Sequence, residues 1–335
     1  MESRYPAYYP RFRCLAGACP DSCCHLWEIQ VDPAAARSYR SLPGALGDTL
    51  RDALYEDGGE TYLSLTEGRC PMWRTDGLCR LQAELGEAAL CRTCREFPRL
   101  RHDYGSFEEL GLELSCPQAA RLILDDPGLP LLRQEMPGGD EADYDTEAMA
   151  LLLSTREEAL AILSGDPPAN EALALLLLRG AQVQQALDGG DLPPFHPDSA
   201  LETARTFAGK GDFGAILSLF RNLEILTPQW QAMLRSPAPA PWESRHLALA
   251  RYFVGRYWLQ AVSDYDLYGR VKFIVTACLL IRALGGDLPR TAQLFSKEIE
   301  NDPENLDTLL DAAYHSPALA DTNLLAELMG GNEEL

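Results

Sequence analysis

Apolar residues recur every three to four positions over most of the chain after residue 145, which is the spacing of one face of an α-helix. Between 244 and 286 this spacing predicts a helical hairpin that turns at Asp264, Tyr265 and Asp266. The full set of predicted helices is 146–165, 171–190, 198–208, 212–235, 244–264, 267–286, 291–301 and 305–315. The pattern therefore predicts a helical bundle over residues 146–335.

The first third of the chain has a different pattern. Residues 27–32 alternate apolar and polar side chains, which predicts a short strand. Asp32 followed by Pro33 is a helix-start signal, so helices are expected over 33–41 and 43–55. Further expected elements are a strand through 62–65, a helix over 81–85, a helix over 87–95 with Cys91 and Cys94 on one face, and a β-hairpin or loop over 100–117.

Residues 125–145 are rich in proline, glycine and aspartate, which indicates a linker or a long surface loop. The predicted organisation is a cysteine-rich region over 1–124, this linker or loop over 125–145, and a helical domain over 146–335. The predicted fold class is mostly α, with a small irregular cysteine-rich α+β metal-binding region in front of a helical bundle.

The charge of the chain limits its partners. Fifty acidic residues outnumber 29 basic ones among 335, giving a formal net charge of -21. Such a chain repels nucleic acid and favours cationic partners such as lysine-rich segments. The first residues contain no apolar stretch of the secretory type, and the longest apolar runs, 172–178 and 273–281, are short of the ~20 residues of a membrane span. We expect a cytoplasmic protein with no nucleic-acid or membrane partner.

Nine of the ten cysteines lie before residue 117, and four of these fall between residues 14 and 24. In a reducing compartment, clustered cysteines indicate metal or cluster ligands and not disulfides. Cys278 lies in an apolar helical pattern and is expected to be a core residue. The predicted metal ligands are Cys14, Cys19, Cys23, Cys24, Cys70, Cys79, Cys91 and Cys94, with Cys116 in reserve.

Two kinds of metal centre use such thiolates. Zinc takes four in a closed tetrahedron, and an iron–sulfur cluster also takes four. The dense and uneven spacing favours a cluster, because only Cys91 and Cys94 form the C-x2-C pair that is usual for zinc. The C-x3-C-x2-C signature of radical chemistry does not occur at Cys19 and Cys23. Eight thiolates exceed the needs of one cluster, so either two centres exist or half of the cysteines are structural.

Two segments, FRCLAGACPDSCCHLWEIQVD (12–32) and GRCPMWRTDGLCRLQAELGEAALCRTCREFPR (68–99), resemble the flagellin lysine-N-methylase (FliB) family. The chain is more distantly similar to the zinc- or iron-chelating CxxCxxCC proteins. The resemblance implies transfer of a methyl group from S-adenosylmethionine to lysines of flagellin, and a 4Fe-4S cluster on N-terminal cysteines. The alternative is a zinc-stapled, non-enzymatic protein-interaction module.

Methyl transfer to an amine needs a group that takes the proton of the lysine, and a carboxylate or tyrosine can do this. The weak candidates are Asp32, Tyr104, Tyr257 and Asp264. Trp27 and Arg256 are weak candidates for cofactor binding, by stacking on a cation and by pairing with a carboxylate. The alternative roles are a core position for Trp27, a helix cap for Asp32 and surface ion pairing for Arg256. No glycine-rich loop follows a strand, so S-adenosylmethionine would need a pocket unlike that of a Rossmann fold.

Overall fold

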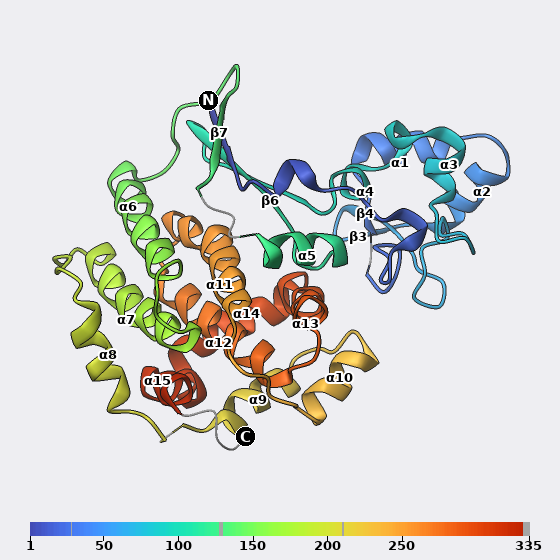
Figure 1. The fold of residues 1–335 in the computed structure, drawn as a ribbon. Helices are drawn as coiled ribbons and strands as arrows, with labels where there is room; N and C mark the ends of the chain where they lie inside the picture. The colour runs from blue at the N-terminus through green and yellow to red at the C-terminus, as the bar shows by residue number, and fades with distance from the viewer. Residues whose placement is uncertain (28, 127–129, 210, 331–335) are drawn as a thin grey trace.

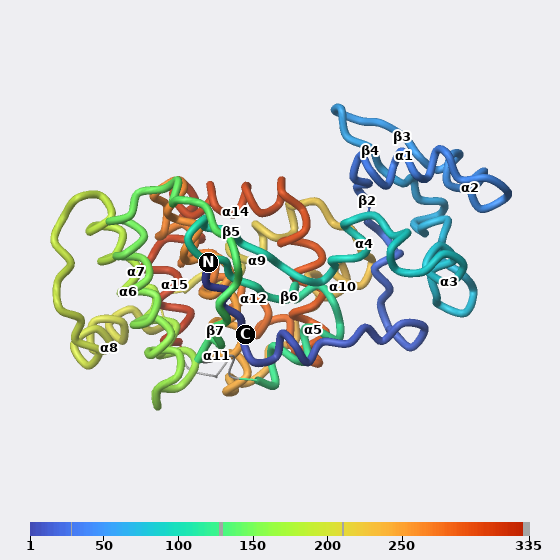
Figure 2. The backbone as a smooth tube through the Cα atoms, turned by 90° about the horizontal axis from the view of Figure 1, so that it is seen from above, coloured from blue at the N-terminus to red at the C-terminus, as the bar shows by residue number. Residues whose placement is uncertain are grey.

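The computed structural model describes residues 1–27, 29–126, 130–209 and 211–330. It is mostly α, as the apolar spacing predicted. A cysteine-rich lobe projects from one side of a larger helical body, and helix α5 (Pro117–Asp125) lies between the two (Figures 1 and 2).

The cysteine-rich lobe contains a small antiparallel sheet in the order β2-β4-β3. Its strands are β2 (Ile29–Gln30), β3 (Leu54–Asp57) and β4 (Glu60–Leu63). The strand expected over 27–32 is thus shorter than predicted, and residue 28 lies outside the described residues. Helices α1 (Pro33–Ser41) and α2 (Gly44–Ala53) agree with the prediction. Tyr39 and Leu50 are buried in a core that is separate from that of the helical body.

The helix expected over 87–95 is instead two short elements. A 3₁₀ turn at Glu87–Ala89 follows α3 (Arg80–Leu85), and α4 (Arg92–Glu96) begins after Cys91. Cys91 has an extended backbone, with φ −61° and ψ 161°, and occupies the N-cap of α4. Cys91 and Cys94 therefore lie at the start of a helix and not on one face of a longer one.

A second sheet, in the order β5-β6-β1-β7, lies against the helical body. The hairpin expected over 100–117 is confirmed by β5 (Arg99–Asp103) and β6 (Phe107–Leu112). Strand β1 (Glu2–Tyr5) is parallel to β6 and antiparallel to β7 (Leu132–Glu135), which lies within the segment expected as a linker or loop.

The helical body contains the predicted hairpin, and α12 (Tyr268–Leu284) lies at its centre with almost every residue buried (Figure 1). The single helix expected over 212–235 is two helices, because Thr227 caps a new helix that begins at Pro228. No described helix is both long and apolar enough to cross a bilayer. The helices are α6 (Thr146–Ile162), α7 (Ala169–Leu187), α8 (Pro197–Arg205), α9 (Phe213–Arg221), α10 (Pro228–Arg235), α11 (Ser244–Tyr257), α12 (Tyr268–Leu284), α13 (Leu288–Phe295), a π-helix (Ser296–Glu300), α14 (Pro303–His315) and α15 (Asp321–Met329).

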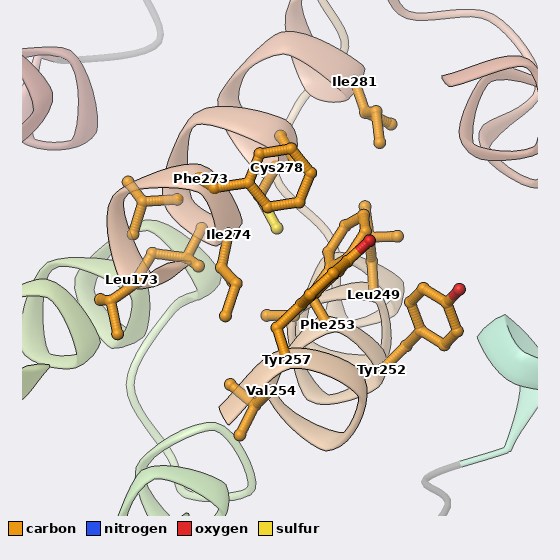
Figure 3. Packing of buried hydrophobic residues seen from close by; sticks show 14 of the residues in the cluster. Leu173, Leu249, Tyr252, Phe253, Val254, Tyr257, Phe273, Ile274, Cys278 and Ile281 are labelled. Atoms are coloured by element: carbon orange, nitrogen blue, oxygen red, sulfur yellow. The ribbon is translucent and has the colours of Figure 1, made fainter. Parts of the chain in front are cut away.

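Aromatic side chains fill the contact between α11 and α12 (Figure 3). The Phe253 ring meets Phe273 edge-on at 5.9 Å between centroids, and Cys278 is fully buried in the same core, as predicted. Leu112 of β6 and Ile123 of α5 belong to this core as well. The second sheet and α5 therefore share the apolar core of the helices, while the division at residues 124 and 145 stays a prediction.

Candidate functional site

Two loops of the cysteine-rich lobe touch through glycines that no larger residue can replace. A Cβ atom on Gly17 would lie 2.7 Å from the carbonyl oxygen of Asp76. A Cβ atom on Gly77, whose φ is +80°, would lie 3.0 Å from the Cα of Gly17. Gly17 lies between Cys14 and Cys19 in sequence, and Gly77 lies two residues before Cys79. The glycines thus allow the two cysteine-bearing loops to approach each other.

The thiols of Cys23, Cys24 and Cys70 interact directly. The Cys70 backbone N–H donates to the Cys24 carbonyl at 2.9 Å, which fixes the two chain segments side by side. Hydrogen bonds from the Cys23 and Cys70 thiols lower the pKa of Cys24 to about 3. The same contacts, followed by burial, raise the pKa of Cys23 and of Cys70 above the usual range. The three thiols therefore lie within electrostatic reach of one another.

Three further thiols join this group. A hydrogen bond with Cys94 lowers the pKa of Cys91 to about 7, and contact with Cys91 raises the pKa of Cys94. Burial raises the pKa of Cys79, whose thiol also lies within electrostatic reach of Cys24 and Cys91. The first thiol set therefore consists of Cys23, Cys24, Cys70, Cys79, Cys91 and Cys94.

A second thiol set comprises Cys14, Cys19 and Cys116, which lie within electrostatic reach of one another. Cys14 and Cys116 also interact with Cys23 of the first set. Cys116 is the N-cap of α5 and belongs to the apolar core of the helical body, and burial raises its pKa to about 11. Cys116 was the reserve ligand in the sequence prediction, and the fold brings it within electrostatic reach of Cys14 and Cys19.

The gathered thiols suit a soft metal centre chemically. All ten cysteines carry free thiols. Among the described residues, no group of three or more His, Cys, Asp or Glu side chains is arranged to hold a metal ion as it stands. Zinc and iron–sulfur clusters both bind thiolates, and the nine N-terminal sulfurs are enough for four-thiolate coordination. The donor chemistry thus fits such a group, and the ligand assignment stays a prediction.

Asp21 ties the cysteine loop to the helical body. Its carboxylate accepts hydrogen bonds from Lys297 Nζ at 2.9 Å, Arg290 Nη1 at 3.0 Å and Gln293 Nε2 at 3.1 Å. The Lys297 side chain is 1% exposed, so the ion pair with Asp21 is shielded from water. Trp27 lies over the same ammonium, with 4.8 Å from Nζ to the ring centroid. The tryptophan that was a candidate for binding a cationic cofactor thus stacks on a lysine of its own chain.

Two of the weak catalytic candidates have clear structural partners. Asp32 accepts hydrogen bonds from the backbone N–H groups of Ala35 at 3.1 Å and Arg92 at 2.8 Å, so it caps α1 and positions the start of α4. Tyr104 stacks on Phe107 with 4.9 Å between ring centroids, and burial raises the pKa of its hydroxyl.

Tyr257 and Arg256 belong to a buried polar network centred on Glu300. The Tyr257 hydroxyl donates to Glu300 Oε1 at 2.8 Å, and Arg256 Nε lies 3.3 Å from the same oxygen. Arg256 Nη1 also donates to the Tyr252 hydroxyl at 2.8 Å. Burial and the Glu300 charge raise the pKa of Tyr257 well above its usual value, so the hydroxyl remains a donor.

Glu300 lies in a π-helix, an element often found at functional sites. Sequence reasoning missed it because a lone glutamate in a helix carries no signal.

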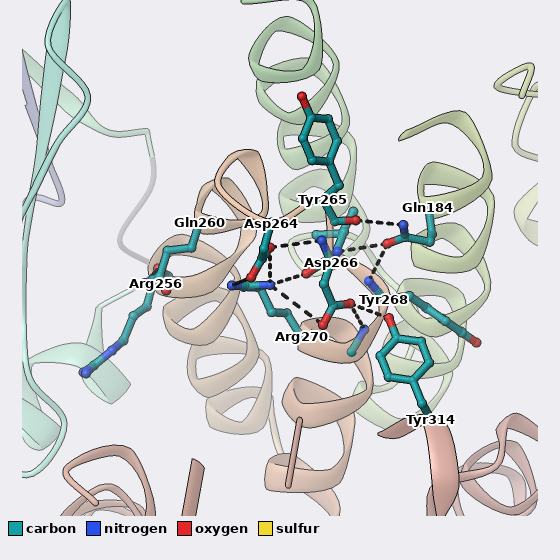
Figure 4. Close-up of polar contacts among 11 residues, drawn as sticks. Gln184, Arg256, Gln260, Asp264, Tyr265, Asp266, Tyr268, Arg270 and Tyr314 are labelled. Carbon is teal, nitrogen blue, oxygen red and sulfur yellow. Dashed lines mark hydrogen bonds and ion pairs between the residues drawn. The ribbon is translucent and has the colours of Figure 1, made fainter. Parts of the chain in front are cut away.

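Asp264 lies in a separate cluster at the turn between α11 and α12 (Figure 4). Its carboxylate pairs with Arg270 through contacts of 3.0 and 2.8 Å. The Tyr314 hydroxyl donates to Asp266, and the Tyr265 hydroxyl donates to Asp145 at 3.0 Å. Figure 4 shows the Arg256 side chain extending away from this cluster. Two of the weak candidates from the sequence, Tyr257 and Asp264, therefore lie in two different polar clusters.

A pocket opens between strands β1, β5 and β6 on one side and helices α6 and α11 on the other. It encloses about 90 Å³. Tyr252 and Arg256 contribute to its wall, so the Glu300 network lies behind one side of the pocket. Pocket residues from the sheet include His102 and Glu109.

Three curated relatives resemble this chain. The lysine-N-methylase of Salmonella typhimurium is 35% identical over 141 residues, which cover 39% of this chain and 34% of the relative. The lysine-N-methylase of Salmonella choleraesuis is 34% identical over 137 residues, which also cover 39% of this chain and 34% of the relative. The flagellar biosynthetic protein FliU of Salmonella muenchen is 35% identical over 132 residues, which cover 36% of this chain and 76% of the relative. No family model and no solved structure matches the chain.

The fold and the site define a mostly α protein whose N-terminal cysteines are gathered as free thiols beside a helical body. The match extends over three quarters of the FliU protein but over only about a third of the two lysine-N-methylases. The chain belongs to the lysine-N-methylase (FliB) family, as its cysteine motifs indicated.

Proposed function

We propose that this chain is an S-adenosylmethionine-dependent protein-lysine N-methyltransferase that acts on flagellin. The observation that carries the proposal is the 35% identity to a protein named lysine-N-methylase. The name of another relative, the flagellar biosynthetic protein FliU, supports a flagellar substrate. The net charge of -21 adds physical support, because an acidic surface attracts a lysine-bearing protein.

The reaction makes limited demands on the protein. The lysine ammonium loses a proton, and the neutral nitrogen then attacks the methyl carbon of the sulfonium. The new C–N bond forms as the S–C bond breaks, and the electron pair of that bond remains on the sulfur of S-adenosylhomocysteine. The chain must align nitrogen, methyl carbon and sulfur, and exclude competing water. Asp32, Tyr104, Tyr257 and Asp264 stay predictions as acceptors of the lysine proton.

The proposal includes a 4Fe-4S cluster on four of the N-terminal cysteines, drawn from the two thiol sets. When bound, the cluster would supply Fe–S bonds that cross-link loops distant in sequence. Methyl transfer from a sulfonium is a two-electron displacement that requires no redox centre. The thiols therefore act, in this proposal, by ordering the lobe that Asp21 attaches to the helical body.

The test uses anaerobically purified protein, flagellin and S-adenosylmethionine with a deuterated methyl group. Mass spectrometry of digested flagellin should find the labelled methyl on lysine ε-nitrogens. Flagellin with acetylated lysines is the matched control and should remain unlabelled. Absence of label on unmodified flagellin, with protein of full iron content, would refute the activity.

Metal analysis of the same preparation distinguishes the two centres. Brown protein that contains iron and acid-labile sulfide supports the cluster. Colourless protein that contains zinc and transfers no methyl group supports the zinc-stapled interaction module instead.

A further inference from the structure

The pocket between the sheet and α11 is rich in guanidinium groups. Four arginines line it, and two carboxylates, Glu109 and Asp126, accompany them. Three of the arginines hold a carboxylate of the chain: Arg4 pairs with Glu2, Arg156 with Glu109 and Arg256 with Glu300. Guanidinium groups gathered around one space favour a carboxylate or another anionic group on the ligand. The four arginines are Arg4, Arg156, Arg251 and Arg256.

Two buried side-chain nitrogens of residues that line the pocket lack a hydrogen-bond partner within the described part of the chain. Arg156 directs Nη1 and Nη2 to Glu109 at 2.7 and 2.6 Å, but its buried Nε makes no hydrogen bond. His102 Nε2 is buried without a partner as well. The Arg156 side chain is 3% exposed. Buried polar atoms are rarely left unsatisfied, so these two point to a bound water or ligand.

Gly255 keeps the pocket open on the side of α11. A Cβ atom on this residue would meet no other atom within 4 Å. Glycine inside a helix is unfavourable by ~1 kcal/mol relative to alanine, so Gly255 lowers the stability of α11. Arg251 is four positions before Gly255 and therefore lies on the same helical face. The glycine therefore leaves open space in the pocket lining on the face of α11 that carries Arg251.

We propose that this pocket binds the α-amino-acid end of S-adenosylmethionine, a proposal that rests on the proposed function above. A guanidinium group matches a carboxylate in a two-pronged hydrogen-bonded pair, and the pocket offers such groups from α11. Glu109 and Asp126, which pair with Arg156 and Arg11, are the lining carboxylates whose oxygens the α-ammonium would approach. Leu112, Ile123 and Leu160 form apolar wall for the methylene groups.

The size of the pocket sets which part of the ligand it holds. About 90 Å³ accommodates a few non-hydrogen groups but not a whole nucleoside. The amino-acid end therefore enters the pocket, and the adenosine remains at the mouth. A lysine ammonium would meet four guanidinium groups in this space, so the substrate lysine approaches from outside it.

The experiment titrates S-adenosylhomocysteine into the full chain by calorimetry and compares Gly255→Leu with Gly255→Ala. The leucine side chain fills the space, so its affinity should fall at least ~10-fold, which corresponds to ~1.4 kcal/mol. The alanine variant, which adds one methyl group, should stay within ~3-fold of the wild type. Methylthioadenosine, which has no amino-acid end, should bind more weakly to the wild type and be unaffected by Gly255→Leu.

The outcomes separate the pocket from the activity. If the wild type and Gly255→Leu bind S-adenosylhomocysteine equally, with matching circular dichroism and melting temperature, the pocket assignment is overturned and the methyltransferase proposal stands. If inorganic phosphate displaces S-adenosylhomocysteine at equal concentration, the pocket is a general anion site and the assignment also fails. If the wild type binds no S-adenosylhomocysteine and labels no flagellin, the proposed function itself fails.

Discussion

Asp21 and Lys297 form an ion pair of 2.9 Å across the boundary between the cysteine loop and the helical body. The two residues are 276 positions apart, and their side chains are only 10% and 1% exposed. Arg290 and Gln293 donate to the same carboxylate, so one acidic residue joins the loop to α13 and the π-helix. The position of the thiols relative to the helices therefore depends on this contact.

Replacing Asp21 with alanine should lower the free energy of unfolding by about 3 kcal/mol or more, because Lys297 would remain buried without its counter-charge. Urea unfolding at neutral pH measures the change. In the double variant Asp21→Ala/Lys297→Met the loss should be smaller than in Asp21→Ala alone, since no unpaired buried charge remains. Equal losses in the two variants would contradict an important role for the charge pair.

Local signals in the sequence located most of the elements. Asp32 followed by Pro33 marked the first helix of the lobe, and the apolar spacing of 244–286 located the α11–α12 hairpin. These signals work because capping and amphipathic spacing act over a few residues. The same local rules misjudged 87–95, where the extended backbone of Cys91 interrupts the helix.

The contacts that build the site could not be read from the sequence. Glu109 and Arg156 pair across 47 residues, and Tyr257 reaches Glu300 across 43. Such pairs follow from packing of distant elements, and each member alone resembles an ordinary polar residue in the sequence. The division of the cysteines into two sets, with Cys116 joining Cys14 and Cys19, depends on the fold in the same way.

Two helical glycines should respond in opposite directions to alanine. At Gly255 the new Cβ meets no atom within 4 Å, so Gly255→Ala should raise the free energy of unfolding by ~0.5–1 kcal/mol through helix propensity. At Gly180 of α7 the Cβ would lie 2.8 Å from Val271 Cγ1, at the contact with α12. Gly180→Ala should therefore destabilise by ~1–3 kcal/mol. Thermal unfolding measures both, and stabilisation at Gly180 would contradict the close helix approach.

The buried His246 imidazole should make stability fall in mild acid. Its Nδ1 accepts a hydrogen bond from the Glu243 N–H at 3.1 Å, and burial lowers its pKa. Below its ordinary pKa of ~6.5 the unfolded chain takes up a proton that the folded chain resists, so the free energy of unfolding decreases as pH falls. Glutamine retains an acceptor for the Glu243 N–H but does not titrate. His246→Gln should thus lose less stability than the wild type between pH ~7 and ~5. If the free energy of unfolding falls by the same amount in both proteins over this range, His246 is not the cause of the pH dependence.

The predicted metal ligands can be tested one cysteine at a time. A serine hydroxyl stays protonated at neutral pH and is a poor ligand for a soft metal centre, so Cys19→Ser and Cys23→Ser should each lose most of the bound metal and become poorly soluble. Cys278→Ser is the matched control, because Cys278 is fully buried in the helical core and belongs to neither thiol set. It should keep its metal, although a buried hydroxyl lowers its melting temperature.

Iron, sulfide and zinc contents measured on the three variants show which of these cysteines bind the metal. Full metal content in Cys19→Ser or Cys23→Ser would refute the ligand assignment at that position. Extending the series to Cys116→Ser and Cys24→Ser assigns the centre to one set, because Cys116 interacts with Cys14 and Cys19, whereas Cys24 interacts with Cys23 and Cys70. Loss of iron in one of these two variants with retention in the other would locate the cluster, and loss of different metals from the two would reveal two centres.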